Sequence, residues 1–162
     1  MRFATILAVM AFAAALAGCA SPRSFGPGSS LAELLVRAGH PTDIRFDRNG
    51  DELWEYTTGP QGTETYLVRS GSDRKVKEVT QLLTEDRLME IVPGTMTKAD
   101  VRNLLGRPSE LTFTGAGIVW SWRFRSFGEQ PGYLTVRFNP DNTVYERIVI
   151  LDPRGGRNIE IK

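Results

Sequence analysis

The chain has 162 residues and a nearly even charge balance, with 20 lysines and arginines against 19 aspartates and glutamates. A near-neutral chain without a basic run is a poor match for nucleic-acid binding, so no nucleic-acid partner is expected. The single cysteine excludes an internal disulfide, so we expect apolar cores to stabilise the fold.

Residues 1–18 predict a signal peptide of the lipoprotein type. Arg2 precedes a short alanine-rich apolar run, and the run ends in Leu16-Ala17-Gly18-Cys19. The run is short for a helix that spans a membrane. This pattern predicts cleavage before Cys19 and lipid on its side chain, which would hold the protein on a membrane. Ala20 follows the cysteine where the inner-membrane retention pattern has Asp, so we expect a lipid anchor in the outer membrane, on its periplasmic side.

Two other outcomes remain open for this leader. Ala15-Leu16-Ala17 is also an A-x-A site, where cleavage would release a soluble protein, and an uncut leader would serve as an anchor. The position of the only cysteine favours lipidation over both. Residues 19–29 are rich in Ser, Pro and Gly, and this composition predicts a flexible tether.

The rest of the chain contains one unit twice. Ser30 and Thr97 each begin an apolar stretch, 67 positions apart (97 − 30), and Gly39 and Gly106 end these stretches at the same spacing (106 − 39). Each start has an acidic residue three positions later, as in a capping box, and each glycine is followed by a proline two positions on. Both stretches therefore predict a helix with its start and stop signals.

Alternating segments separated by turn sequences follow each helix and predict antiparallel strands. The expected fold class is α+β: two tandem units, each with one or two short helices packed on a three- to four-stranded antiparallel meander. We place the first unit at residues 30–81 and the second at 82–162. The two sheets are expected to join edge to edge, which would protect exposed edge strands. In the strand 119–125, alternation predicts one face with Trp120, Trp122 and Phe124 and an opposite face with Ser121, Arg123 and Arg125.

Three segments of the second unit carry a family resemblance: Pro93-Gly94-Thr95-Met96-Thr97, Leu104-Leu105-Gly106-Arg107-Pro108 and Trp120-Ser121-Trp122-Arg123. They resemble the SmpA/OmlA family of outer-membrane lipoproteins, also called BamE-like. Two departures are an inserted Thr95 and a Trp122 where Tyr is usual. The first unit is similar only through Gly39-x-Pro41 and the strand 54–56, and the tandem layout looks like the fold of β-lactamase-inhibitor proteins.

The resemblance implies a non-enzymatic accessory of outer-membrane β-barrel assembly, with envelope or assembly proteins as partners and a phospholipid headgroup as a further ligand. The implied contact patch includes Phe113 and Arg125, with Trp120 and Trp122 on the aromatic strand beside them. The residues alone leave two interpretations of the aromatic row formed by Trp54, Tyr56, Trp120 and Trp122. It is either a ligand cleft or the packed face of the sheet, and its period of two favours the packed face.

No catalytic residue, metal site or cofactor is predicted. His40 is the only histidine, and the chain contains none of the usual metal-binding spacings. The run Asp47-Arg48-Asn49-Gly50-Asp51 is similar to the start of a calcium loop, but its twelfth position is Thr58 instead of Glu, so we expect a hairpin turn. The sequence thus predicts a protein-interaction module. The alternative is a periplasmic binding or inhibitory protein that holds an envelope enzyme or peptide on a joined sheet surface.

Overall fold

A computed structural model describes residues 20–115, 117–126, 131–151 and 157–159. The α+β expectation is confirmed, because two antiparallel sheets follow one another along the chain, with strand orders β1-β2-β3-β4 and β5-β6-β7-β8-β9. The second sheet has one strand more than the predicted meander. The first unit contains η2 (Pro22–Ser24), α2 (Leu31–Ala38), β1 (Asp43–Phe46), β2 (Glu52–Thr58), η3 (Pro60–Gly62), β3 (Glu64–Ser70) and β4 (Val76–Gln81). The second contains α3 (Glu85–Met89), α4 (Lys98–Leu105), β5 (Glu110–Thr114), β6 (Gly117–Arg125), β7 (Pro131–Phe138), β8 (Val144–Leu151) and β9 (Arg157–Ile159).

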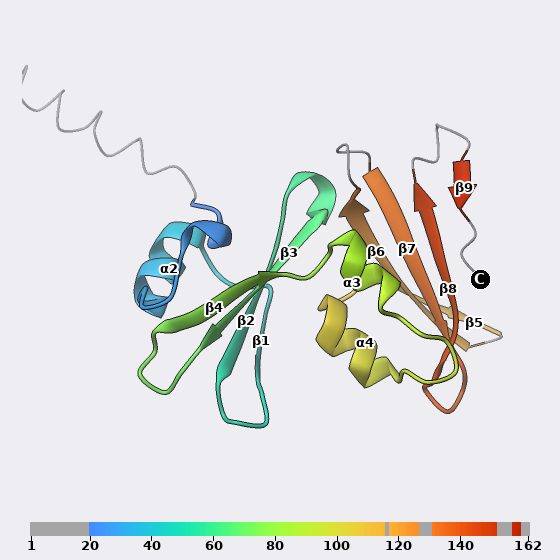
Figure 1. Cartoon of the computed structure of the whole chain (residues 1–162), viewed down its shortest axis with the longest axis horizontal. Helices are drawn as coiled ribbons and strands as arrows, with labels where there is room; N and C mark the ends of the chain where they lie inside the picture. The colour runs from blue at the N-terminus through green and yellow to red at the C-terminus, as the bar shows by residue number, and fades with distance from the viewer. Residues whose placement is uncertain (1–19, 116, 127–130, 152–156, 160–162) are drawn as a thin grey trace, which may run out of the picture.

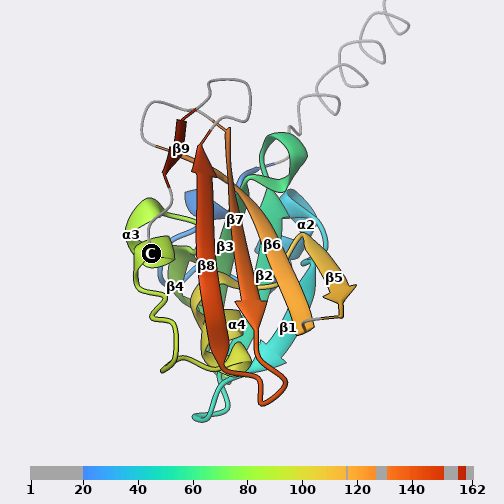
Figure 2. The same ribbon diagram turned by 90° about the vertical axis from the view of Figure 1, so that its right-hand side faces the viewer.

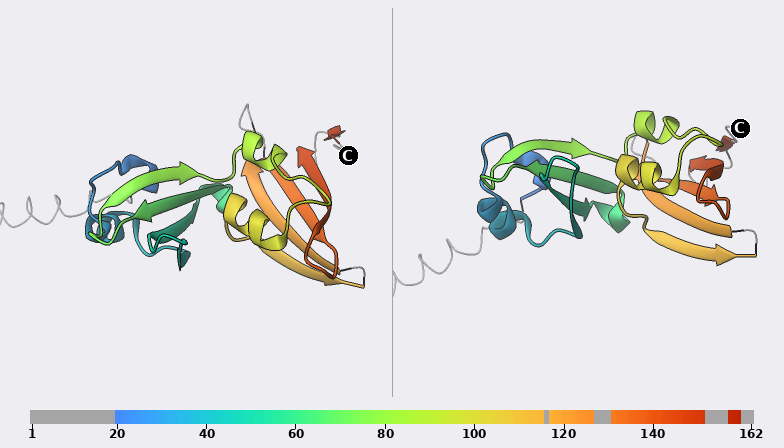
Figure 3. Two further views of the ribbon diagram at one scale, coloured as in Figure 1. Left: turned by 60° about the horizontal axis from the view of Figure 1, so that its bottom comes forward. Right: turned by 90° about the horizontal axis from the view of Figure 1, so that it is seen from below.

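The elements form layers along the long axis of the molecule (Figure 1). Helix α2 lies at one end, followed by the first sheet, then α3 and α4, and then the second sheet at the other end. The two sheets are separate, so the expected edge-to-edge join is wrong. The physical reason is that the chain leaves β4 directly into α3 and α4, and these helices fill the space between the sheets (Figure 3).

Both long helices begin and end as their sequences predict. The Ser30 hydroxyl accepts a hydrogen bond from the Ala32 N–H at 3.1 Å, and Thr97 forms a reciprocal capping box with Asp100. The capping box predicted for the first helix is not formed, because Glu33 instead pairs with Arg37 at 2.9 Å. Gly106 ends α4 with a φ of 78°, which favours glycine. A Cβ at this position would also lie 2.8 Å from a carboxylate oxygen of Glu55, so glycine is required here for space as well.

The repeat extends to a shared tertiary contact. In each unit the residue that caps the helix forms a bridge with the turn before the fourth strand, Ser30 with Lys75 before β4 and Thr97 with Thr143 before β8. Backbone hydrogen bonds of 2.8–3.0 Å continue this contact into the first helical residue of each unit. Each helix is therefore positioned over its own sheet from its N-terminal end.

Each unit has its own apolar core between helix and sheet. The predicted alternation in β6 is confirmed, since Trp120, Trp122 and Phe124 are buried while their neighbours on the other face are half-buried. The first core consists of Phe25, Leu31, Leu34, Trp54, Tyr56, Tyr66, Val68 and Val76. The second consists of Leu83, Leu88, Ile91, Val101, Leu105, Trp120, Trp122, Phe124, Leu134, Val136, Phe138, Val144 and Val149.

The segment predicted as a flexible tether differs from that expectation over residues 20–29. Phe25 is 4% exposed and belongs to the first core, and the N–H of Gly28 donates to the carbonyl of Val76 at 2.8 Å. The N–H of Ala20 already donates to the carbonyl of Arg37 at 2.9 Å. One large apolar side chain thus fixes a stretch whose composition alone predicts flexibility.

The signal peptide at residues 1–18 and Cys19 lie outside the described residues. Among the residues that are described, no helix combines the length and the apolar character needed to cross a membrane.

Candidate functional site

The four predicted contact residues do not form one patch. Trp122 is fully buried and Trp120 is 8% exposed, and both face α4 within the second core. Phe113 lies on β5 and is 77% exposed. Arg125 is the last residue of β6 and points to the opposite face of the sheet from Trp122. Phe113 and Arg125 are therefore surface residues on different faces, and the two tryptophans are parts of the core.

The aromatic row is the packed face of the sheet, and the ligand-cleft interpretation is wrong. The ring of Trp120 lies edge-on to Trp122 with centroids 5.9 Å apart, and edge-on to Phe138 at 5.0 Å. The ammonium of Lys98 lies over the Trp120 ring, 5.9 Å from its centroid. These rings fill the space between β6, β7 and α4, and they stabilise the unit without facing solvent.

The outer face of the second sheet carries two arginine–tyrosine stacks. The Arg123 guanidinium lies 5.8 Å from the ring centroid of Tyr133, and that of Arg137 lies 5.7 Å from the ring of Tyr145. Arg137 also forms an ion pair with Glu146 at 3.3 Å. Figure 2 shows this face from the front, and in the described part of the chain neither α3 nor α4 lies over it. Arg and Tyr are enriched in the energetically dominant parts of protein interfaces, so this face is a candidate binding surface.

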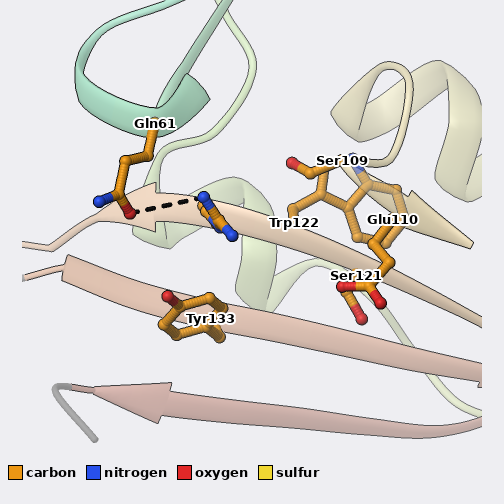
Figure 4. Close-up of a pocket in the computed structure, with 7 residues that line it drawn as sticks. Gln61, Ser109, Glu110, Ser121, Trp122 and Tyr133 are labelled. Atoms are coloured by element: carbon orange, nitrogen blue, oxygen red, sulfur yellow. Dashed lines mark hydrogen bonds between the residues drawn. The ribbon is translucent and has the colours of Figure 1, made fainter.

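A polar pocket borders this face at the point where β5 begins. β5 pairs only with residues 117–121 of β6, so the last four residues of β6 extend beyond it. There, η3 of the first unit approaches the second sheet, and Gln61 accepts a hydrogen bond from Arg123 at 3.4 Å. The pocket has a volume of about 220 Å³ and is lined by Gln61, Ser109, Glu110, Ser121, Trp122, Arg123 and Tyr133 (Figure 4).

The chemistry of this pocket suits a side chain better than a cofactor. Its volume is below the roughly 300 Å³ at which pockets for small organic ligands begin. Its walls offer both charge signs, Glu110 and Arg123, together with hydroxyl and amide groups. A polar side chain of a partner protein could exchange hydrogen bonds with these groups. The sequence gives little signal for this pocket, because its lining residues come from both units.

A buried ion cluster joins the two units. Glu55 on β2 is fully buried, and it accepts hydrogen bonds from the Arg102 side chain at 2.7 Å and from the Arg107 backbone N–H at 2.5 Å. Arg102, on α4, also forms an ion pair with Asp43 on β1. Burial, and then the positive charge of Arg102, lowers the pKa of the neighbouring Arg45. Both oxygens of Glu55 accept hydrogen bonds from the second unit, so this ion cluster links the two units.

The edge strand β5 is exposed along its whole length. Leu111 and Phe113 point to one face of it and are 49% and 77% exposed. The equivalent residues of β1, again 67 positions earlier, are Ile44 and Phe46, which are also exposed (111 − 44; 113 − 46). The prediction named Phe113 but missed Leu111, although the alternation Leu-Thr-Phe-Thr over 111–114 is a usable signal.

The remaining polar motifs take ordinary structural roles. The predicted hairpin turn at Asp47 is confirmed, because its carboxylate accepts hydrogen bonds from the N–H groups of Asn49 and Asp51. Asp51 in turn forms an ion pair with Lys77 at 2.7 Å. His40 is exposed in the loop after α2. Within the described ranges no group of three or more His, Cys, Asp or Glu is arranged to hold a metal ion.

Comparison with known proteins places the chain in no established family. No family model matches it, and no curated protein sequence matches it significantly. A solved structure, a DUF4309 family protein (YjgB) from Bacillus subtilis subsp. subtilis str. 168, matches with 14% identity over 76% of this chain and 79% of that chain. The TM-score is 0.29, which is too low to support an argument about either fold or function.

The identification with SmpA/OmlA is therefore wrong, and the tandem likeness to β-lactamase-inhibitor proteins has no support either. The physical reason lies in the residues that carried the resemblance. Helix caps, glycine stops and a row of core aromatics are what a helix packed on an antiparallel meander requires. Such residues describe a scaffold, and unrelated proteins share scaffolds.

Proposed function

We propose that this chain is an exported, lipid-anchored protein that acts without enzymatic activity as a protein-interaction module in the cell envelope. The observation that carries the interaction role is the pair of arginine–tyrosine stacks on the uncovered outer face of the second sheet. The Leu16-Ala17-Gly18-Cys19 sequence supports export and lipidation. A role in β-barrel assembly depended on the SmpA/OmlA resemblance and is not part of the proposal.

The contacts of Ala20 support a close attachment to the membrane. Ala20 donates to the end of α2 and packs against the first core. Consecutive Cα atoms are about 3.8 Å apart, so a lipid on Cys19 would begin beside this end of the fold. The second sheet lies at the other end of the long axis (Figure 1). In this arrangement the outer face is directed away from the membrane, toward a partner. Ala20 after the cysteine is the reason to propose the outer membrane, on its periplasmic side.

In vivo photo-crosslinking tests the interaction surface. A photoreactive residue replaces Tyr145, which is 59% exposed on the outer face, and in a control replaces Phe46, which is 68% exposed on the first unit. The proposal predicts a defined adduct with an envelope protein from position 145 and none from position 46. If position 145 gives no adduct, or if both positions give the same adducts, the proposed interaction surface is wrong.

The second candidate is a soluble periplasmic binding or inhibitory protein. The A-x-A site at Ala15-Leu16-Ala17 favours it, since cleavage there leaves no lipid anchor. Such a protein could not use a joined double sheet, because the sheets are separate. It would use the same outer face and pocket. Fractionation separates the two candidates: the soluble one predicts the chain in the periplasmic fraction without acyl label.

A further inference from the structure

Among the edge strands β1, β4 and β5, β5 is the least protected. The edge strand β1 carries two charged residues, Asp43 and Arg45, whose side chains contact α4. The beginning of β4 is covered by backbone hydrogen bonds to residues 28–29. β5 has a charge only at its first residue, Glu110, and it pairs with β6 without a bulge. Natural edge strands usually carry charges, prolines or bulges that prevent pairing with another chain.

The space beside β5 is open. Figures 2 and 3 show β5 at the margin of the second sheet, and in the described part of the chain no element lies beyond it. All five of its residues are exposed. Its outer row of backbone N–H and C=O groups is therefore accessible to a further strand.

We propose that β5 pairs antiparallel with β5 of a second copy of this chain, about a two-fold axis at Thr112. In this register Thr112 lies opposite the same residue of the second copy, Leu111 lies opposite Phe113, and Glu110 lies opposite Thr114. Apolar and Thr–Thr cross-strand pairs stabilise a sheet, and no like charges face each other. The strand is self-complementary at all five positions, which is the reason to assign a second copy and not a foreign peptide.

This pairing completes the proposed binding surface. Two five-stranded sheets become one continuous sheet, and their outer faces lie side by side. Because Glu110 lines the polar pocket, the end of β5 from the second copy comes next to that pocket. The contact is isologous, so association closes at the dimer and does not propagate into a fibre. The pairing of the two β5 strands does not depend on a lipid at Cys19.

Cysteine crosslinking of the full chain in its native envelope tests the register. Thr112→Cys places two thiols opposite each other on the two-fold axis, within the reach of a disulfide. In Thr114→Cys, each thiol lies four residues from its counterpart, about 13 Å along the strand, which is beyond that reach. The proposal predicts at least about tenfold more crosslinked dimer from Thr112→Cys than from Thr114→Cys. The unsubstituted chain reports any crosslink that comes from Cys19.

A second pair of variants distinguishes specific pairing of the two β5 strands from disulfides that form when two chains collide at random. Phe113→Lys, added to Thr112→Cys, replaces an apolar cross-strand contact by a charge and should abolish the dimer band. Phe46→Lys is the matched control at the equivalent position of β1 and should leave the band unchanged. Both side chains are exposed, so thermal unfolding should show intact folds. Equal crosslinking at 112 and 114, a dimer that survives Phe113→Lys, or a disulfide only to an unrelated protein would each overturn the proposal.

Discussion

The buried ion cluster between the units predicts a large effect of one substitution, Arg102→Met. Glu55 is fully buried, and Arg102 supplies its only side-chain hydrogen bond among the described residues, at 2.7 Å. Methionine keeps much of the length of arginine but leaves the Glu55 carboxylate with only the backbone N–H of Arg107. A buried charge without its partner cannot recover the solvation that it lost on folding.

The expected loss is about 3 kcal/mol in the free energy of unfolding. Removal of one partner from a buried ion pair costs about 3–5 kcal/mol. We expect the lower end of this cost because the Arg102 side chain is 21% exposed and one hydrogen bond to Glu55 remains. For a folded chain of this size, 1 kcal/mol shifts Tm by about 3–4 °C, so Tm should fall by about 10 °C. Because the cluster bridges the two units, we expect the unsubstituted chain to unfold in one transition and Arg102→Met to unfold in two.

Urea and thermal unfolding of the variants measure both effects. The control is Arg69→Met, which breaks an exposed ion pair of 2.8 Å with Glu78 inside the first unit and should cost less than about 1 kcal/mol. Adding Glu55→Gln to Arg102→Met removes the buried charge and should recover about half of the loss. If Arg102→Met costs no more than the control and unfolding stays one transition, the cluster does not hold the units together.

Three further results are expected. Burial raises the pKa of Tyr56 to about 12, so between its ordinary pKa and this value the unfolded chain loses a proton that the folded chain keeps. The free energy of unfolding should therefore fall as pH rises through this range. Tyr56→Phe should reduce the fall, measured by urea unfolding at about pH 9 and about pH 11. Hydrogen bonds from Thr97 lower the pKa of Asp100, so this carboxylate stabilises the fold at neutral pH and ceases to do so as pH falls through that lowered pKa. Thr97→Ala should weaken this acid dependence and remove a helix cap worth about 1 kcal/mol. Unfolding measured across an acid titration tests both effects. Trp122→Ala should cost about 3–5 kcal/mol because the ring is fully buried, whereas Phe113→Ala should change stability by less than about 0.5 kcal/mol; equal costs in calorimetry would contradict the assignment of core and surface.

Local features of the fold could be predicted from the sequence because local rules determine them. The N-caps at Ser30 and Thr97, and the glycine stops 67 positions apart, are patterns within one helix. The alternation in β6 gave the buried face around Trp122 for the same reason. A scaffold of two helix-and-meander units follows from these signals alone.

The arrangement of the units could not be predicted, because it depends on contacts between distant residues. Glu55 stands between two core aromatics in β2, a position where alternation predicts a solvent-facing side chain. It is buried because α4 of the second unit covers that face, and its partner Arg102 is 47 positions away. Phe25 is similar: within a Ser-, Pro- and Gly-rich stretch, its burial depends on a core formed by α2 and the first sheet.

The candidate site was predicted only in part. The alternation identified Arg123 and Arg125 as residues of the face opposite the tryptophans. The contact patch, which included Phe113, came from a resemblance that is wrong. The stacking of Arg137 on Tyr145 joins neighbouring strands, and the pocket joins both units. Neither can be read from spacing along one segment.

The most direct test of the proposed function is the mass of the mature N-terminus, measured by mass spectrometry on the protein purified from its native envelope. We expect a chain that begins at Cys19 and carries acyl groups on that residue. An unmodified chain that begins at Gly18, or one that retains residues 1–18, would contradict the proposal.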